Sequence, residues 1–173
     1  MVIKIELTKG RQALVDEIDS DLGNLSWYTL NKGSLSYARR NDYSRGKGKT
    51  ILMHRIILSR LVGRPLDSLE KCDHINRNGL DNRRENLRLA TRAQNAANQK
   101  KRVGPNSFKG VAWRMNHKNP KRGRWEASIR DEGKKIHLGY FASELEAARA
   151  YDRAALEHFG EFARTNFDKE DYK

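Results

Sequence analysis

A short stretch in the first half of the chain gathers side chains that can bind a cation and move a proton. It begins with the acid–histidine pair Asp73-His74 and runs to Asn95. The carboxylate of Asp73 is a preferred ligand of hard divalent cations, and the amide oxygen of Asn95 can serve as a second, neutral ligand. His74 has an ordinary pKa near neutral pH, so it can take a proton from water. The three residue types together predict a one-metal site that activates water.

Local signals predict how these side chains could meet. Residues 69–73 can run extended, and Asn78-Gly79 predicts a tight reversal, because both residues tolerate positive φ. The Leu-Arg-Leu run at 87–89 alternates as a half-buried strand does. Thr91 is followed three residues later by a glutamine, a capping box that predicts a helix through about residue 99. A strand, a loop, a strand and a helix would bring the predicted acid and amide ligands to one cation, as in a one-metal nuclease site.

From Asp73 onward the chain contains Asp-His-Ile-Asn-x-Asn-x-Leu-Asp-Asn-Arg-x-x-Asn-Leu-Arg. This run resembles the ββα-metal fold of HNH endonucleases, in the subclass of phage and intron-borne homing enzymes. The resemblance implies that His74 is the general base and that Asp73 and Asn95 hold the cation. It also implies that Asn86 orients the base through its side-chain carbonyl. Asn95 stands where many members have histidine, and an all-oxygen ligand set favours Mg²⁺ or Mn²⁺ over Zn²⁺, with one ion per site.

Each of these residues also has a plainer interpretation. An Asp-His pair alone is usually a surface turn, and Asn-Gly-Leu-Asp-Asn alone is usually a turn and helix cap. His54 precedes an apolar helical run that ends near Gly63, and it could be a second site histidine. A packing or phosphate-binding role is favoured for His54, because the motif already has a base. Cys72 is predicted to be a small buried strand residue.

The bulk composition restricts the partner. The chain has 173 residues, a formal net charge of +13 and a sequence pI near 10.0, so a polyanion is the first expectation. The length allows two small domains. Its one cysteine excludes an internal disulfide and a multi-cysteine zinc site. Without an apolar run long enough to cross a bilayer, or a signal-peptide core, we expect a cytoplasmic protein of a bacterial or phage-infected cell that is not secreted.

Composition and patterning divide the chain into segments. Residues 1–50 are predicted to be a strand-rich lead-in to a nuclease core at 51–99, and 1–99 would be one domain. Residues 100–106 are predicted to be a basic linker, because Lys100, Lys101 and Arg102 are followed by breaking residues. Such a linker can lie along a nucleic-acid backbone. A second domain at 107–167 and a tail at 168–173 complete the chain.

The second domain shows clear strand and helix periodicity. Residues 109–114, 124–131 and 134–141 are predicted to be three antiparallel strands with one apolar and one basic-polar face. Ser143 begins a capping box, and apolar residues then recur at helical spacing up to Gly160. The helix is expected to cover the apolar face and leave the cationic face free. The predicted fold class is therefore α+β, with a strand-rich nuclease region followed by a three-stranded sheet on one helix.

Four segments of this domain resemble the APETALA2-type DNA-binding domain: Phe108-Lys109-Gly110-Val111, Trp125 to Arg130, His137 to Phe141, and Ala147 to Ala155. The resemblance implies that the outward face of the sheet reads DNA. By position, the base-contacting residues would be Arg114, Arg130, Lys135 and His137, with Arg124 on a phosphate. Ala112 and His137 stand where plant members usually have arginine and tryptophan, so the plant target sequence does not carry over.

Together these patterns predict a homing-type, site-directed DNA endonuclease. Its partner would be double-stranded DNA, bound by a monomer or a transient dimer, with no membrane and no small-molecule cofactor. Two alternatives stay open. One is a DNA-binding regulator with a relic nuclease fold, and the other is an RNA-binding or RNA-cleaving protein, since basic charge does not distinguish the polymers.

Overall fold

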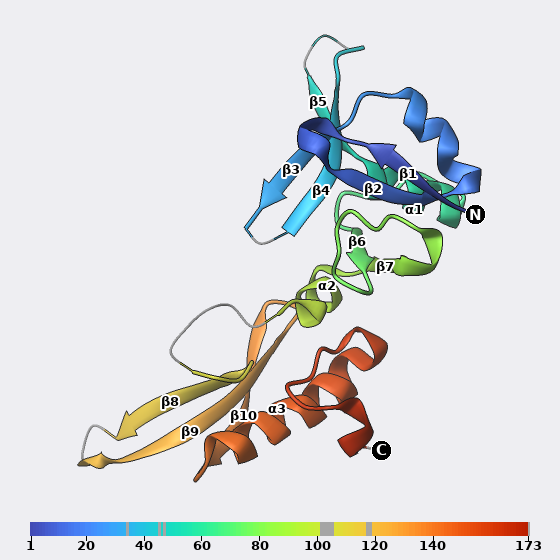
Figure 1. Cartoon of the computed structure of the whole chain (residues 1–173). Coiled ribbons are helices and arrows are strands. Elements are labelled where there is room, and N and C mark those ends of the chain that lie inside the picture. Colours follow the sequence, from blue (N-terminus) through green and yellow to red (C-terminus); the bar gives the residue numbers. More distant parts are fainter. Residues whose placement is uncertain (34, 45, 47, 101–105, 117–118, 173) are drawn as a thin grey trace. The chain divides into compact units, whose positions relative to one another are not determined.

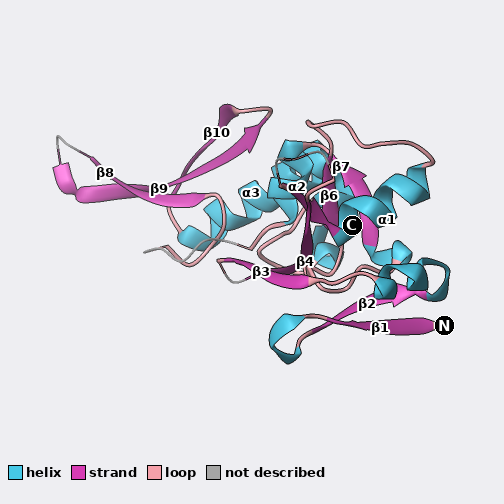
Figure 2. Cartoon of the chain, turned by 90° about the horizontal axis from the view of Figure 1, so that it is seen from above, coloured by secondary structure: helices cyan, strands magenta, loops and turns pink. Residues whose placement is uncertain are grey.

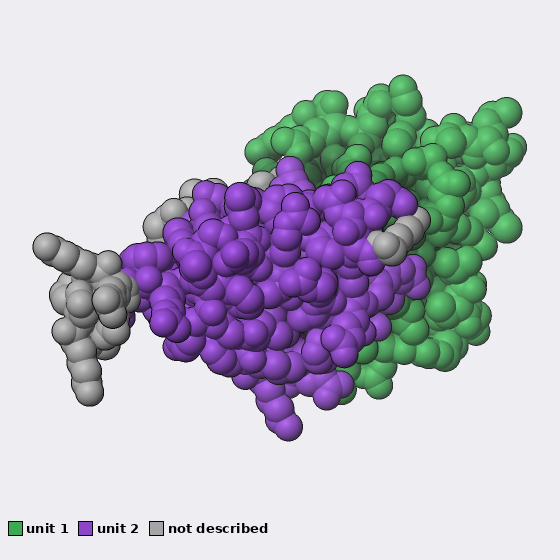
Figure 3. Space-filling view, turned by 90° about the horizontal axis from the view of Figure 1, so that it is seen from below, with its two compact units in different colours: residues 1–91 green, residues 92–173 purple. Residues whose placement is uncertain are grey.

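The computed structural model describes the chain except residues 34, 45, 47, 101–105, 117, 118 and 173. The side chains of Asn116 and of residues 119–122 are also outside the description. The predicted linker residues Lys101 and Arg102 therefore lie outside the described residues. Helices make up 34% and strands 37% of the chain, and the described sheets are antiparallel, which confirms the α+β class. The chain forms two compact units, residues 1–91 and 92–173 (Figure 3).

The first unit is rich in short strands (Figure 1). Its strands and its α-helix, in chain order, are β1 (Val2–Glu6), β2 (Gln12–Asp16), β3 (Tyr28–Lys32), β4 (Leu35–Asp42), β5 (Lys49–Leu52), α1 (Met53–Val62), β6 (Lys71–His74) and β7 (Leu87–Ala90). β1 pairs with β2, β3–β4–β5 form one sheet, and β6 pairs with β7. Short 3-10 helices cover Thr8–Gly10, Glu17–Asn24 and Arg84–Asn86.

One apolar core joins the lead-in to the segment that carries the motif. The side chains of Val15, Met53 and Ile57 are fully buried in it, and Leu87 of β7 is 3% exposed. Trp27 is buried in this core and donates from Nε1 to the carbonyl of Leu22, at 2.8 Å. Burial of this surface is the main stabilising term for so small a unit. The motif hairpin is therefore fixed by residues from the first 60 positions of the chain.

The turn after β6 differs from the predicted one. Positive φ occurs at Arg77 (φ 64°), whereas Asn78 and Gly79 are outside the positive-φ region. Glycine is required at 79 for another reason: a Cβ there would lie 2.5 Å from the Ser36 carbonyl oxygen and 2.6 Å from the Tyr37 ring. The loop after His74 therefore packs closely on β4.

The second unit is a three-stranded sheet covered by a helix (Figures 1 and 2). Its elements are α2 (Arg92–Asn98), β8 (Val111–Asn116), β9 (Asn119–Asp131), β10 (Lys134–Phe141), α3 (Glu144–Phe159) and 3-10 helices at Gly160–Phe162 and Lys169–Tyr172, with strand order β10-β9-β8. The two residues between β9 and β10, Glu132 and Gly133, both have positive φ, as a tight two-residue hairpin requires. α2 packs within this unit, where Ala97 joins the core that contains Ile129 and Tyr151.

α3 begins and ends where the sequence predicts. Ser143 accepts from the amide of Glu146, whose carboxylate in turn accepts from the amide of Ser143, so the capping box is formed. Gly160 is the C-terminal cap. The buried face of α3 differs in detail from the apolar pattern of the sequence. The first apolar residue of that pattern, Leu145, is 54% exposed, and the alanines Ala147 and Ala148 pack on the sheet instead. None of the described helices is both long and apolar enough to span a membrane.

Candidate active site

The β6–β7 hairpin holds the predicted acid and base. In its register Asp73 lies opposite Arg88 and His74 lies opposite Leu87. Asp73 is 3% exposed and His74 is 6% exposed. Arg88 donates from Nε and Nη2 to Oδ2 of Asp73, each at 2.9 Å. The carboxylate is thus buried beside a fixed cation.

The His74 imidazole is oriented by an amide that the sequence did not single out. Its Nε2 lies 3.1 Å from Oδ1 of Asn82, a fully buried side chain whose Nδ2 donates to the sulfur of Met53 at 3.4 Å. With the amide nitrogen directed at the sulfur, Oδ1 accepts from His74, which places the histidine proton on Nε2. Nδ1 is then the basic nitrogen. Burial lowers the pKa of His74, and the hydrogen bond that His74 donates to Asn82 partly offsets this effect, so the ring is neutral near pH 7.

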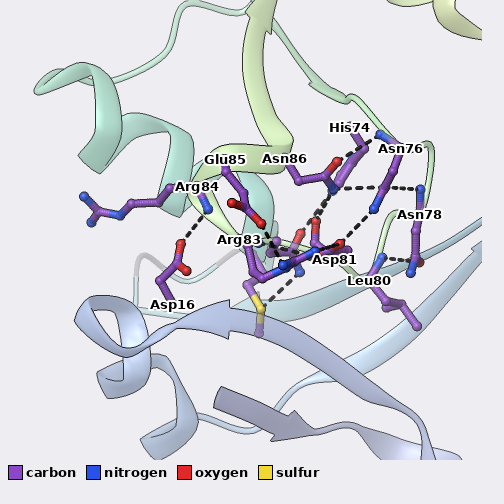
Figure 4. Close-up of polar contacts among 12 residues, drawn as sticks. Asp16, His74, Asn76, Asn78, Leu80, Asp81, Arg83, Arg84, Glu85 and Asn86 are labelled. Atoms are coloured by element: carbon purple, nitrogen blue, oxygen red, sulfur yellow. Dashed lines mark hydrogen bonds and ion pairs between the residues drawn. The ribbon is translucent and has the colours of Figure 1, made fainter. Parts of the chain in front are cut away.

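Asn86 holds the loop rather than the ring in the contacts shown in Figure 4. Its Nδ2 donates to the carbonyl of Asp81 at 2.7 Å and to Oδ1 of Asn76 at 3.0 Å, and its Oδ1 accepts from the Asn76 amide at 2.9 Å. Asp81 directly precedes Asn82. Asn86 therefore fixes the backbone that carries the amide facing His74, and its predicted orienting role on the base remains a prediction.

The lead-in also fixes this loop. The amide of Leu14 donates to the carbonyl of Leu80, and the amide of Asn82 donates to the carbonyl of Leu14, both at 2.8 Å. Asp16 accepts from the Arg84 amide at 2.7 Å, as Figure 4 shows, and buried Asp19 pairs with the Arg84 side chain at 2.7 Å. These partners are more than 60 residues away in sequence. The first strands, which carry no site residue of their own, position the site.

Two further rings surround His74. The His54 ring centroid lies 5.1 Å from that of His74 at an interplanar angle of 90°, and Tyr37 lies 5.4 Å from His54 and 5.9 Å from His74. Nδ1 of His54 is buried and has no hydrogen-bond partner among the described residues. Burial lowers the pKa of His54 to about 3. The structure thus places His54 beside the predicted base as a neutral, buried packing partner.

The predicted cation ligands can be judged by donor type. Asp73 offers carboxylate oxygen, which suits a hard cation. Asn95 lies on α2, in the second unit, with a half-buried side chain, and its sharing of an ion with Asp73 stays a prediction. Over the described part of the chain, three or more His, Cys, Asp or Glu side chains do not gather into a metal-binding group. The predicted ligand pair, one carboxylate and one amide, has too few of these side chains to count as such a group, so this finding does not test it.

Cys72 precedes the acid on β6 and is half-buried. Its Sγ lies 3.7 Å from the carbonyl oxygen of His54. Burial raises the pKa of the thiol to about 12, so it is protonated at neutral pH. Cys72 lies on a strand and packs against the apolar core, as predicted, but it is half-buried rather than buried.

The polar face of the second unit carries the other predicted contacts. Arg114 of β8, Arg124 and Arg130 of β9, and Lys135 and His137 of β10 are all exposed. Lys100 is also exposed. Three of these residues meet at one carboxylate: Arg114, Lys135 and His137 lie 2.5, 2.6 and 3.4 Å from Glu126 oxygens. The predicted sheet face is therefore cationic around a buried acid.

Two important residues, Asn82 and Glu126, were missed because their roles depend on distant partners. Asn82 lay in a run that looked like a turn, and Glu126 was one polar residue among several on a strand. Neither residue carried a local signal, because Asn and Glu are common residue types at solvent-facing positions.

Comparison with known proteins confirms both resemblances. Residues 52–97 match the family model described as HNH endonuclease. The uncharacterized HNH endonuclease L560 of Acanthamoeba polyphaga mimivirus is 34% identical over 125 residues, which cover 72% of this chain and 60% of the viral protein. APETALA2-like protein 2 of Oryza sativa subsp. indica is 42% identical over 79 residues, 43% of this chain and 17% of the plant protein. The ethylene-responsive transcription factor WRI1 of Arabidopsis thaliana is 46% identical over 71 residues, 40% of this chain and 15% of that protein.

The matches thus span three fifths of the viral relative and less than a fifth of each plant relative. They support a nuclease segment joined to a DNA-binding segment. The first holds the Asp73-His74 hairpin, and the second is the sheet-and-helix part of the chain.

Proposed function

We propose that the protein is a site-directed DNA endonuclease of the homing type, acting in the cytoplasm of a bacterial or phage-infected cell. The observation that best supports this is His74 itself. It is a neutral imidazole whose Nε2 is held by Asn82 and which lies next to the buried carboxylate of Asp73. A base with a fixed tautomer beside an oxygen ligand is what metal-assisted hydrolysis of a phosphodiester needs.

In the proposed mechanism Nδ1 of His74 takes a proton from the water that attacks the scissile phosphorus. Asn82 keeps the other ring proton on Nε2 and stabilises the imidazolium that forms. Asn86 holds the loop, and the aromatic rings at 37 and 54 keep the imidazole in place. The products would carry 5′-phosphate and 3′-hydroxyl ends. A Mg²⁺ or Mn²⁺ ion held by Asp73 and Asn95, one per site, would supply electrostatic stabilisation of the pentacovalent phosphorus and the departing 3′ oxygen.

The sheet face of the second unit would hold duplex DNA. Long cationic side chains on a narrow sheet can reach base edges in a major groove, and exposed Arg124 suits a phosphate. Lys100, Lys101 and Arg102 would follow the backbone between the two segments. One nuclease site cuts one strand, so a monomer would nick and a transient dimer on DNA would break both strands.

The test is cleavage of a random-target duplex library by the purified full chain with Mg²⁺, followed by sequencing of the ends. We expect the cut sites to share a surrounding sequence and to carry 5′-phosphate ends, and we expect cleavage to depend on added Mg²⁺ or Mn²⁺. Cuts with 3′-phosphate ends, or uniform degradation, would contradict the site-directed mechanism. Cleavage of a matched RNA library in preference to DNA would point to the RNA-cleaving alternative.

One observation favours a second candidate, a DNA-binding regulator that does not cleave. Arg88 pairs with Asp73, and a guanidinium held at the carboxylate opposes a cation there. A regulator of this kind would bind DNA with a sequence preference and would not cleave it in the presence of either Mg²⁺ or Mn²⁺. Measurement of binding and cleavage on the same library separates the two candidates.

A further inference from the structure

Glu126 occupies an unusual place for an acid. It lies on β9, the central strand, among the cationic residues of the polar face, yet it is only 5% exposed. Oε2 accepts from Nε of Arg114 at 2.5 Å, and Oε1 accepts from Nζ of Lys135 at 2.6 Å. Nδ1 of His137 lies 3.4 Å from Oε1. One carboxylate thus connects cations from both neighbouring strands.

The register explains how these side chains converge. Opposite Glu126 stand Ala112 on β8 and Tyr140 on β10. Because the Ala112 side chain is only a methyl group, Arg114 can reach diagonally across to the carboxylate. On the other side the register shifts between His137 and Gly139, and the His137 ring lies against Tyr140 with centroids 4.7 Å apart. The acid therefore lies between side chains of both neighbouring strands.

The Glu126 carboxylate is ionised at neutral pH. Hydrogen bonds from Lys135 and then Arg114 outweigh the effect of burial and lower the pKa of Glu126 to about 2. A sheet face that bound only phosphate groups would have higher affinity without this negative charge, because the carboxylate repels the phosphates whose attraction drives non-specific binding. The side chains of its basic partners Arg114 and Lys135, in contrast, are 54% and 43% exposed and remain open to a ligand.

We infer that Glu126 is a positioning residue that sets the sequence preference of the sheet face for duplex DNA. It holds Arg114, Lys135 and His137 in one arrangement, so that their donors meet base edges in a fixed pattern, and it reduces binding to phosphate alone. An arginine anchored through Nε still presents its terminal nitrogens to a guanine edge. This inference rests on the proposed function, because it requires that the sheet face contact DNA.

The test compares full-length wild type, Glu126→Gln and Glu157→Gln. Glu157 is exposed on α3, so its change alters net charge equally without touching the sheet face. Binding is measured on the preferred duplex selected by wild type and on a random duplex, as a function of salt. We expect Glu126→Gln to bind random duplex roughly 5-fold more tightly and to lose about 10-fold of the preference ratio. Glu157→Gln should keep the wild-type ratio.

A second variant separates charge from position. Glu126→Asp keeps the negative charge but withdraws the carboxylate by one methylene, so it should retain weak binding to random duplex while losing part of the preference. It also decides the question if Glu126→Gln does not fold. An unchanged preference ratio in both folded variants overturns the inference while leaving the proposed DNA contact in place. Absence of preferential duplex binding by wild type overturns both.

Discussion

Asp73 and Glu126 are two buried carboxylates, each paired with cations across antiparallel strands, but their surroundings differ. The Asp73 side chain is 4% exposed and its partner Arg88 is 14% exposed. The Glu126 side chain is 6% exposed, whereas its partners Arg114 and Lys135 are 54% and 43% exposed. The first pair is closed off from solvent and the second offers its cations to a ligand. The comparison suggests that the first unit is arranged for chemistry at a fixed point and the second for contact over a surface.

The supporting contacts follow the same division. In the first unit, side-chain amides and carboxylates bind backbone groups of the loop after His74. Such buried hydrogen bonds are costly to break, because an unpaired polar group is left behind. On the sheet face, the ion pairs of Glu126 have half-exposed cationic partners, so solvent screens them and they contribute less to stability. Substitutions should therefore damage structure and catalysis in the first unit, and affinity or preference in the second.

The largest effect is expected at Asn82. Asn82→Ala removes the acceptor that holds Nε2 of His74, so the ring can adopt the wrong tautomer, and nicking should fall by roughly 10²–10³-fold with duplex binding retained. Plasmid nicking and gel-shift assays check this. Asn78→Ala in the same loop is the matched control and should stay within a few-fold of wild type. Equal losses in both variants would mean that loop integrity, not tautomer control, is what matters.

Asp19 is a second buried carboxylate of the first unit, and its substitution tests how much such ion pairs contribute to stability. It is fully buried and pairs with Arg60 at 3.0 Å and Arg84 at 2.7 Å. Asp19→Asn leaves two cations facing a neutral amide and should cost about 3 kcal/mol at pH 7. Hydrogen–deuterium exchange of the β1 and β2 amides measures the loss in this unit. An unchanged exchange rate would show that the pairing contributes nothing net.

The pH dependence of the Asp19 pairing has a definite sign. Burial alone would raise the pKa of Asp19, but the hydrogen bonds and charges of Arg84 and Arg60 together lower it below its ordinary value. The group therefore stabilises the fold above its unfolded pKa, and this contribution is lost as pH falls toward the folded pKa. Between pH 7 and pH 3 wild type should lose more stability than Asp19→Asn. Parallel losses would contradict the assignment.

Gly79 should show a smaller, purely steric effect. Gly79→Ala forces a Cβ against the Ser36 carbonyl and the Tyr37 ring, at a cost of roughly 1–3 kcal/mol. Gly23→Ala is the control, because its Cβ would meet only the Ile5 side chain at 3.9 Å. The stabilities of the two variants are compared in urea, with unfolding of the first unit measured by hydrogen–deuterium exchange of its amides. Equal stabilities would show that the loop moves away from β4 without cost.

The smallest effects are expected on the sheet face. Arg124→Ala should weaken binding to all duplexes a few-fold and lower the salt slope by about 1, as loss of one phosphate contact does. Arg114→Ala should instead lower the preference ratio by about 10-fold. Exposed Arg153 on α3 supplies the control substitution. If Arg124→Ala and Arg114→Ala change affinity and the preference ratio in the same way, the sheet face binds DNA without sequence preference.

Much of the fold follows from local pattern. The capping box at Ser143, the glycine after α1 and the alternation along β9 each depend on residues a few positions apart, so the sequence predicts them. β3 was not predicted from the sequence, and its Tyr28 is 44% exposed. Short strands on a partly solvated sheet carry little periodic signal.

The site is less predictable, because its contacts join distant positions. The Asp73-His74 pair is recognisable from its motif, but the choice of Asn82 over Asn86 at Nε2 depends on the path of the loop. Asp19 and Arg84 are 65 residues apart, and their pairing has no local signature. Glu126 gains its partners only through the register of three strands. Sequence pattern predicts residue types near a site, whereas tertiary contacts decide which side chain performs each task.

His74 is proposed to be the base of a DNA-cleaving site. The direct measurement is nicking of supercoiled plasmid by wild type and by His74→Ala in the presence of Mg²⁺ or Mn²⁺, with duplex binding measured in parallel. We predict that wild type converts plasmid to the open-circular form and that His74→Ala binds equally well but nicks at least about 100-fold more slowly. Equal nicking by both proteins, or binding without nicking by wild type with either ion, would contradict it.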